Sequence, residues 1–399
     1  MSLAVPAAPA SLVPFGALSL AYHASIGLFN PYAPLWFQSL GFSTFAIGAI
    51  ASLQAWTRIV VPYGWSWLGD HWEQGARRGT LLRIASTLAL LFALGLLVAR
   101  DLAPVAMFVV LLFMANGGIV PLAEAALSHR LATARGLDVA RYGRVRVWGS
   151  IGFIVSVSVS GAALQAYGIS ALPLFLVLIS ATIALAAWRL PARGGMAPSA
   201  RLAPPGGVWA IVREPTVAWF FAGVFLTVLA HTSLYVYLSL YLVNLGYGKT
   251  AVGALWAVSV VGEIVFFWTQ GHWFSRWGAQ SWLVIAAGIS IVRFAATALF
   301  GGSTAVLVAA QCLHAVTFAA HHASCIAMVD RHFPGALRGR GQALYTTLGY
   351  GVSGVLGGLG GGIIAQHWGF PAVFAAAALV SVAALVCCRR SLHHASASN

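Results

Sequence analysis

The sequence predicts an all-α, polytopic membrane protein with 12 transmembrane helices arranged as two six-helix halves. Three observations predict this fold. Of the 399 residues, 60% are hydrophobic and only 8% are charged, whereas soluble domains carry about 25% charged residues. Apolar runs long enough to cross a hydrocarbon core of about 30 Å recur from end to end. The two halves also resemble each other weakly, which indicates an internal structural repeat.

The apolar runs give the expected helices in chain order. In the first half they lie at 13–38, 44–68, 80–99, 103–127, 143–167 and 169–188. The connection that follows is rich in Pro, Gly and Arg, a composition typical of a linker. In the second half they lie at 215–243, 250–273, 280–300, 303–328, 341–366 and 369–388. We therefore expect an N-terminal half (1–188), a cytoplasmic linker (189–214) and a C-terminal half (215–399).

The formal net charge of +14 follows from where arginine lies relative to these helices. Twelve crossings place both termini on one side, and all but four of the 22 basic residues fall on that side. The exceptions are Arg58, Arg100, Lys249 and Arg293. Lys and Arg are in excess on the cytoplasmic side of membrane proteins. We therefore expect cytoplasmic termini and location in the cell inner membrane, with lipid bilayer rather than nucleic acid as the partner. The protein is expected to be a monomer.

Several chemistries are disfavoured. The four cysteines lack metal-ligand spacing, so no metal is expected. The glycine run VSGVLGGLGGGI (352–363) follows no strand and precedes no GK[ST], which argues against nucleotide binding. No serine–histidine–acid set has recognisable spacing, so we expect neither an enzyme nor a cofactor. The opening MSLAVPAAPAS lacks the basic region of a cleavable signal peptide.

An internal repeat relates the two halves. TFAIGAIASLQAWTRIV (44–60) aligns with KTAVGALWAVSVVGEIV (249–265), shifted by 205 residues, and a second register is shifted by 198. The first register pairs Gly41 with Gly246, Arg58 with Glu263 and Asp70 with Ser275. The second pairs Asn116 with His314 and Glu124 with His322.

The twelve runs, the linker and the repeat resemble the major facilitator superfamily. LGDHWEQGARRG (68–79) is similar to its loop motif after the second helix, with looser spacing, and the resemblance assigns Asp70, Arg77 and Arg78 to gating. YGRVRVWGSIGF (142–153), VGALWAVSVVGEIVFF (252–267), GISIVRF (288–294) and LHAVTFAAHH (313–322) resemble the phenylpropionate permease branch, relatives of lactose and nucleoside proton symporters. The resemblance implies a proton-coupled symporter that imports a small organic solute by alternating access. An aromatic or other organic carboxylate is the expected substrate.

Ionisable residues within apolar helices are costly and usually face a cavity or a partner. Glu263 lies near the membrane midplane, where desolvation favours its neutral form, and we interpret it as the proton carrier. Arg58 has the equivalent depth and is the better counter-ion for a substrate anion; Arg293 is expected to contact substrate or to offset Glu263. The alternative for all three is a structural ion pair, or for the two arginines a snorkelling side chain.

Polar and aromatic side chains complete the expected site. His314 lies at nearly the depth of Glu263, and a histidine–carboxylate pair is a plausible proton relay. His322, opposite Glu124 in the repeat, is assigned with Glu124 to the cytoplasmic gate. The remaining substrate-binding residues are expected to be Tyr32, Asn116, His231, Tyr235 and Trp256. Packing is the alternative role for each of these side chains.

Two other functions stay open at this point. A proton-coupled exporter of drugs or metabolites would be favoured by a complete loop motif around Asp70. A non-transporting membrane receptor or scaffold would have no need for Glu263 and Arg58 at mid-depth, nor for a solvent cavity.

Overall fold

The computed structural model describes residues 12–72, 77–133, 136–192, 207–272 and 274–397. Helices account for nearly all of these residues. The two short strands, β1 (Ala132–Thr133) and β2 (Gly136–Leu137), pair antiparallel with Ala132 opposite Leu137. The prediction of an all-α fold is confirmed.

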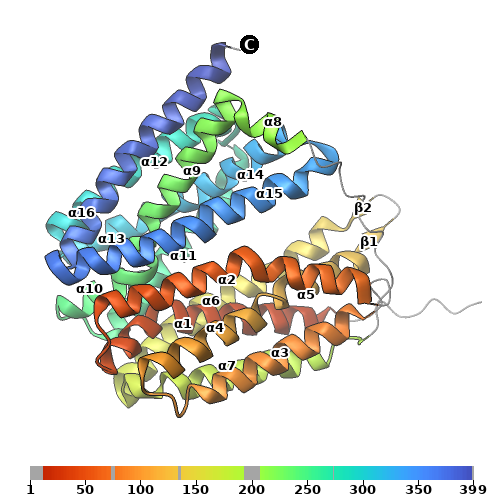
Figure 1. Cartoon of the computed structure of the whole chain (residues 1–399), viewed down its shortest axis with the longest axis vertical. Coiled ribbons are helices and arrows are strands. Elements are labelled where there is room, and N and C mark those ends of the chain that lie inside the picture. Colours follow the sequence, from red (N-terminus) through yellow and green to blue (C-terminus); the bar gives the residue numbers. More distant parts are fainter. Residues whose placement is uncertain (1–11, 73–76, 134–135, 193–206, 273, 398–399) are drawn as a thin grey trace, which may run out of the picture.

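Helices α1 to α7 form the lower group in Figure 1. They are α1 (Val13–Ser39), α2 (Thr44–His71), α3 (Arg78–Gly95), α4 (Leu102–Asn116), α5 (Ile119–Arg130), α6 (Val139–Tyr167) and α7 (Leu172–Trp188), with the short η2 (Ile169–Ala171) before α7. Helix α1 packs on α6 and α7, while α3 packs on α4 and α7. The expected single helix over 103–127 is wrong in one respect: Gly117 and Gly118 separate α4 from α5.

The upper group contains the remaining helices (Figure 1). They are α8 (Gly207–Arg213), α9 (Pro215–Thr232), α10 (Leu238–Asn244), α11 (Lys249–Thr269), α12 (Gly278–Phe300), α13 (Thr304–Cys312), α14 (His321–His332), α15 (Arg338–Thr346) and α16 (Ser353–Ala397). Short 3-10 turns are η4 (Gln270–His272), η5 (Phe274–Arg276) and η7 (Gly335–Leu337). Three π-helical turns join longer helices: η3 (Ser233–Tyr237), η6 (Ala315–Ala320) and η8 (Thr347–Val352). Helix α16 packs on α9 and α12.

Glycines with positive φ end equivalent helices in the two groups. Gly41 (φ 84°) follows α1 and Gly246 (φ 90°) follows α10, and these are the two residues that the repeat aligns. Gly168 (φ 87°) follows α6, and Gly369 (φ 80°) interrupts α16 at the corresponding place. Residues with a Cβ atom rarely adopt a positive φ, so glycine permits the chain to reverse direction sharply at these positions.

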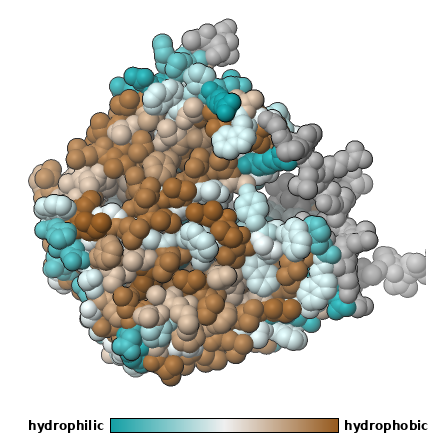
Figure 2. Space-filling view, in the orientation of Figure 1, coloured by the Kyte–Doolittle hydropathy of each residue, from teal (hydrophilic) through white to brown (hydrophobic). Residues whose placement is uncertain are grey.

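Ten helical stretches of the described chain are long and apolar enough to cross a membrane. Several combine two helices, such as Leu102–Arg130, and the longest, Arg338–Ser396, runs through non-helical Gly369. Figure 2 shows a broad hydrophobic surface over the bundle, with hydrophilic residues gathered near its edges. Such a surface is suited to lipid.

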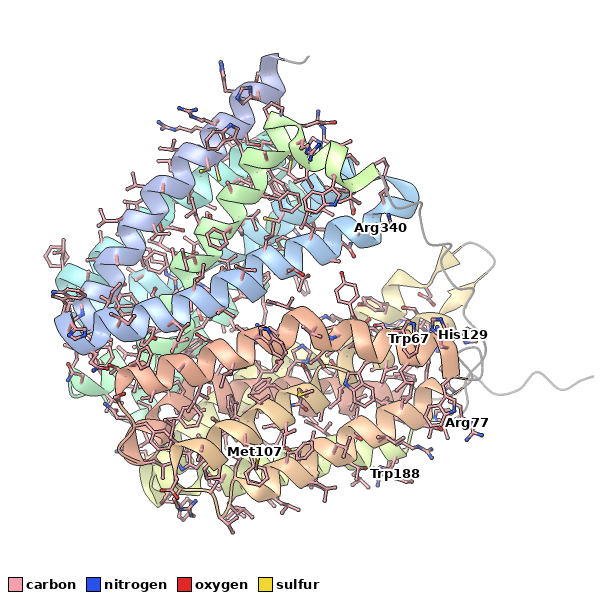
Figure 3. The ribbon with its side chains drawn as sticks, viewed as in Figure 1. Trp67, Arg77, Met107, His129, Trp188 and Arg340 are labelled. Atoms are coloured by element: carbon pink, nitrogen blue, oxygen red, sulfur yellow. The ribbon has the colours of Figure 1, made fainter. Side chains whose placement is uncertain are left out.

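The two groups meet through hydrogen bonds near the α1–α2 turn. Ser52 Oγ donates to Val355 O at 2.7 Å, and Lys249 N donates to Gln165 Oε1 at 2.7 Å. Gly48 also approaches Gly358 so closely that a Cβ atom at Gly48 would overlap the Gly358 carbonyl oxygen. At the opposite end, Figure 3 shows Trp67 and His129 on the lower group and Arg340 on the upper group.

Candidate functional site

Two adjoining cavities lie between helices of the bundle. The first has a volume of about 310 Å³ and is lined by both groups, through α1, α2, α9, η3, η6, η8 and α16. The second, of about 380 Å³, is lined mainly by the lower group. The residues common to both are Ile26, Phe29, Asn30, Arg58 and Tyr350. Such mostly apolar cavities with a few polar groups are typical ligand sites.

Arg58 is the charged side chain that lines both cavities. It extends from α2, and no hydrogen bond or ion pair joins its guanidinium to any described residue. Phe29, Tyr235 and Phe318 line the first cavity together with Arg58. A planar guanidinium in this setting presents paired N–H donors that match a carboxylate.

A second polar cluster, the Glu263 cluster, lies within the upper group. His314 Nε2 is 3.0 Å from Glu263 Oε1, and His314 Nδ1 is 2.7 Å from Nη1 of Arg293. Arg293 also donates to Thr317 Oγ1 at 2.8 Å and to Gln311 Oε1 at 3.2 Å. His314 therefore lies between the carboxyl and guanidinium groups.

The hydrogen bonds fix the tautomer of His314. A guanidinium has only donors, so His314 Nδ1 must accept from Arg293. The proton of the neutral ring then lies on Nε2, which donates to Glu263 Oε1. A second proton on His314 would face Arg293 directly. Of the two residues, Glu263 is therefore the one that can take up a proton without losing the Arg293–His314 bond.

Stacked rings connect this cluster with the first cavity. Phe318, which lines that cavity, lies parallel to His314, with ring centroids 5.1 Å apart and an interplanar angle of 2°. It also stacks on His322, at 6.1 Å and 12°. His322 Nδ1 is 2.9 Å from the Tyr345 hydroxyl, which is 3.3 Å from the hydroxyl of cavity-lining Tyr350. The ring stack thus links His314 to the cavity through Phe318, and the hydrogen bonds link His322 to the cavity through Tyr345 and Tyr350.

The structure brings together only some of the residues expected at the substrate site. Arg58 and Tyr235 line the first cavity, and Arg58 and Asn116 line the second. Glu263 and His314 are paired with each other, but neither is among the residues lining the two cavities.

Four expected substrate contacts lie elsewhere. The Tyr32 hydroxyl donates to Val157 O at 2.7 Å between α1 and α6, and Trp256 Nε1 donates to Ser239 Oγ at 3.1 Å. His231 Nδ1 is 2.8 Å from Thr227 O. Arg293 is only 1% exposed because its guanidinium is enclosed by the cluster. Each of these side chains is occupied by packing or hydrogen bonding away from the cavities.

The residues assigned to gating are spread over several helices. Arg77 occupies the N-cap position of α3 and its guanidinium carbon lies 5.9 Å from the centroid of the Trp72 ring, and Arg78 begins α3. The side chain of Asp70, at the end of α2, lies outside the part of the structure described. Glu124 accepts a hydrogen bond from the Tyr142 hydroxyl at 2.8 Å. His322 instead contacts Tyr345, as described above.

Sequence reasoning missed Phe318 and Tyr350 as cavity residues. Phe318 is four positions from both His314 and His322, and this spacing, which places residues on one helix face, was the available signal. Nothing comparable identifies Tyr350. Its orientation depends on the π-helical turn η8, which leaves no hydrophobic periodicity of its own.

The MFS_1-like family profile matches residues 16–376. The probable 3-phenylpropionic acid transporter of Escherichia coli is 27% identical over 369 residues, covering 91% of this chain and 93% of that protein. The maltose permease of Geobacillus stearothermophilus is 25% identical over 342 residues, covering 82% and 81%.

Solved structures show the same fold at lower identity. A crystal structure of the nucleoside transporter NupG superposes with a TM-score of 0.79 at 19% identity, covering 95% of this chain and 99% of that one. An inward-facing bacterial homologue of the lysosomal transporter Spinster gives 0.72 at 14%, covering 96% and 97%. Since the family match spans most of the chain, the protein belongs to the MFS_1-like family and is a multi-pass transporter of the major facilitator superfamily.

Proposed function

We propose that this transporter is a proton-coupled symporter that imports an aromatic or other small organic carboxylate by alternating access. The observation that carries the proposal is Arg58, a cation without an ionic partner among the described residues, in a cavity lined by both helix groups. The name of the Escherichia coli relative, a probable 3-phenylpropionic acid transporter, supports the same substrate class.

We infer twelve crossings with both termini in the cytoplasm. Two crossings add to the ten apolar stretches: α1, with 27 residues, and the division of Arg338–Ser396 at Gly369. The halves are then 1–188 and 215–399, joined by the linker 189–214. In this orientation the contacts of Gly48 and Ser52 close the outer end, so the described conformation faces inward.

Glu263 is proposed to carry the coupled proton and His314 to position its carboxyl group. A carboxylate accepts the Nε2–H of His314, whereas a protonated carboxyl group has one acceptor fewer and an added donor. Loading of the proton therefore changes the bond to His314 and, through Arg293, the packing of α11, α12 and the π-turn η6. Asp70, Arg77, Arg78, Glu124 and His322 are proposed to act at the cytoplasmic gate.

Uptake by proteoliposomes tests this function. Labelled 3-phenylpropionate is offered with an inward proton gradient, without a gradient, and with a protonophore. We expect accumulation only with the gradient. Arg58→Gln should reduce affinity for 3-phenylpropionate at least tenfold, because a truncated charge-assisted hydrogen bond costs about 1.5 to 3 kcal/mol. Its effect on the neutral amide analogue should be small. Equal losses for acid and amide would assign Arg58 to structure instead.

A further inference from the structure

Three aromatic side chains in the wall of the first cavity share an unusual local backbone. Tyr235, Phe318 and Tyr350 each lie in a π-helical turn: η3, η6 and η8 respectively. These are the three π-turns of the described residues, and all are in the upper helix group. Turns of this kind are rare in helices and frequently occur at functional sites.

The π-turns have a direct geometric consequence. A π-turn accommodates an extra residue, which changes the direction of the side chains within it relative to a regular α-helix. Each of the three π-turns contributes one aromatic ring to the wall of the first cavity. Three separate helical segments therefore each contain a π-turn at the point where they line the first cavity.

Neighbouring groups hold two of the rings in place. Phe318 lies between the parallel rings of His314 and His322. The Tyr350 hydroxyl is held at 3.3 Å from that of Tyr345, and the two rings meet edge to face at 5.7 Å. Aromatic surfaces fixed before a ligand arrives lower the entropy lost on binding.

The lower group supplies the other side of this cavity, including Arg58 and Gln54 of α2 and Asn30 of α1. Charged and polar groups from the lower group therefore share the cavity with the three π-turn rings of the upper group, and Phe29 and Phe37 of α1 add two further rings. A ligand with an anionic end and an aromatic ring fits both sets of groups, and it would be in contact with both halves at once.

We propose that Tyr235, Phe318 and Tyr350 form an aromatic clamp that selects a planar aromatic ring in the substrate. The pairing of this ring with a carboxylate rests on the proposed function of Arg58. Selection of the aromatic ring rests on the three π-turns, and it can be measured separately from recognition of the carboxylate.

The test compares four probes on the purified full-length protein by equilibrium binding. They are 3-phenylpropionate, 3-cyclohexylpropionate and the two corresponding amides. The cyclohexyl ring is at least as hydrophobic as phenyl but has no π face. Aromatic pairs contribute interaction energy beyond burial of area, so we expect wild-type protein to prefer phenyl by about two- to tenfold.

Phe318→Leu and Tyr235→Leu should each bring the phenyl-to-cyclohexyl ratio towards one. Tyr235→Leu disturbs no histidine stack and so supplies the answer if Phe318→Leu does not fold. Phe300→Leu is the matched control, since Phe300 is exposed at the end of α12, lines neither cavity and should leave the ratio unchanged.

Each outcome decides the proposal. Equal wild-type affinity for the two rings, or an unchanged ratio in both leucine variants, overturns the clamp. A ring preference that is the same for acids and amides supports the clamp and contradicts the proposed carboxylate specificity. A preference for the acids over the amides without a preference for phenyl supports the carboxylate specificity and contradicts the clamp. Failure of all four probes to bind overturns both the clamp and the carboxylate specificity.

Discussion

Nε2 of His314 lies 3.0 Å from Oε1 of Glu263, joining the segment before η6 to α11. The opposite side of the same ring accepts from Arg293, so the imidazole separates a buried cation from a carboxyl group. A direct Glu263–Arg293 pair would hold Glu263 in its charged form. The interposed ring removes that direct stabilisation of the charged form, so Glu263 can take up a proton more readily.

The first prediction concerns Glu263→Gln, which imitates the permanently protonated carboxyl group. The variant should still bind 3-phenylpropionate and exchange it across a proteoliposome membrane. It should fail to accumulate this substrate when a proton gradient is imposed, because no proton can be released. Counterflow and gradient-driven uptake, measured on the same preparation, separate the two activities. Accumulation at the wild-type level would remove Glu263 from the proton pathway.

The second prediction concerns the stability of the Glu263 cluster. His314→Ala leaves a donor of Arg293 and an acceptor of Glu263 without their partner in a buried site. The unfolding free energy should fall by about 1 to 3 kcal/mol. Thermal unfolding in detergent should show this, with exposed His129→Ala as a control that has little effect.

The double variant Glu263→Gln with His314→Ala extends this test. Since the two residues touch, their effects should not add, and the interaction energy should be about 0.5 kcal/mol or more. Additive losses would mean that the carboxylate of Glu263 makes no stronger contact with His314 than an amide does.

The relative position of residues along neighbouring helices was predictable from the sequence because each apolar run has a start and a rise of 1.5 Å per residue. Glu263 and His314 were placed at similar depths on this basis, and they are in contact. The aligned glycines Gly41 and Gly246 likewise share a positive φ. Both results follow from position along the helix alone.

The direction in which a side chain faces was much less predictable. Tyr32 and Trp256 point into helix contacts rather than towards a cavity. In a soluble helix an apolar stripe identifies the buried face, but a membrane helix is apolar towards both lipid and its neighbours. The π-turns add a further rotation at Phe318 and Tyr350 that no apolar pattern records.

The third prediction tests topology with single cysteines in a background where exposed Cys312 is replaced by Ser. His129→Cys should react with a membrane-impermeant thiol reagent only from the cytoplasmic side. Asn244→Cys, exposed at the other end, should react only from outside. The expectation follows from the excess of arginine on the side of His129. Reaction of His129→Cys in intact cells would reverse the proposed orientation.

The fourth prediction concerns the close approach of Gly48 and Gly358 at the end where the two helix groups meet. Any Cβ at Gly48 would overlap the Gly358 carbonyl oxygen, so Gly48→Val should oppose this contact. Overpacking typically costs about 1 to 3 kcal/mol. Because the described conformation contains the contact, the population should move towards one that is open at this end, by about five- to hundredfold.

Accessibility of the cavity measures this shift. Ala51→Cys lines the first cavity and, in the Cys312→Ser background, should become more reactive from outside when combined with Gly48→Val. Gly64→Val is the matched control on the same helix, since a Cβ there meets no atom within 4 Å. If Gly64→Val raised outside labelling as much as Gly48→Val, the effect would belong to α2 in general. Unchanged labelling with Gly48→Val would show that closure does not depend on the glycine contact.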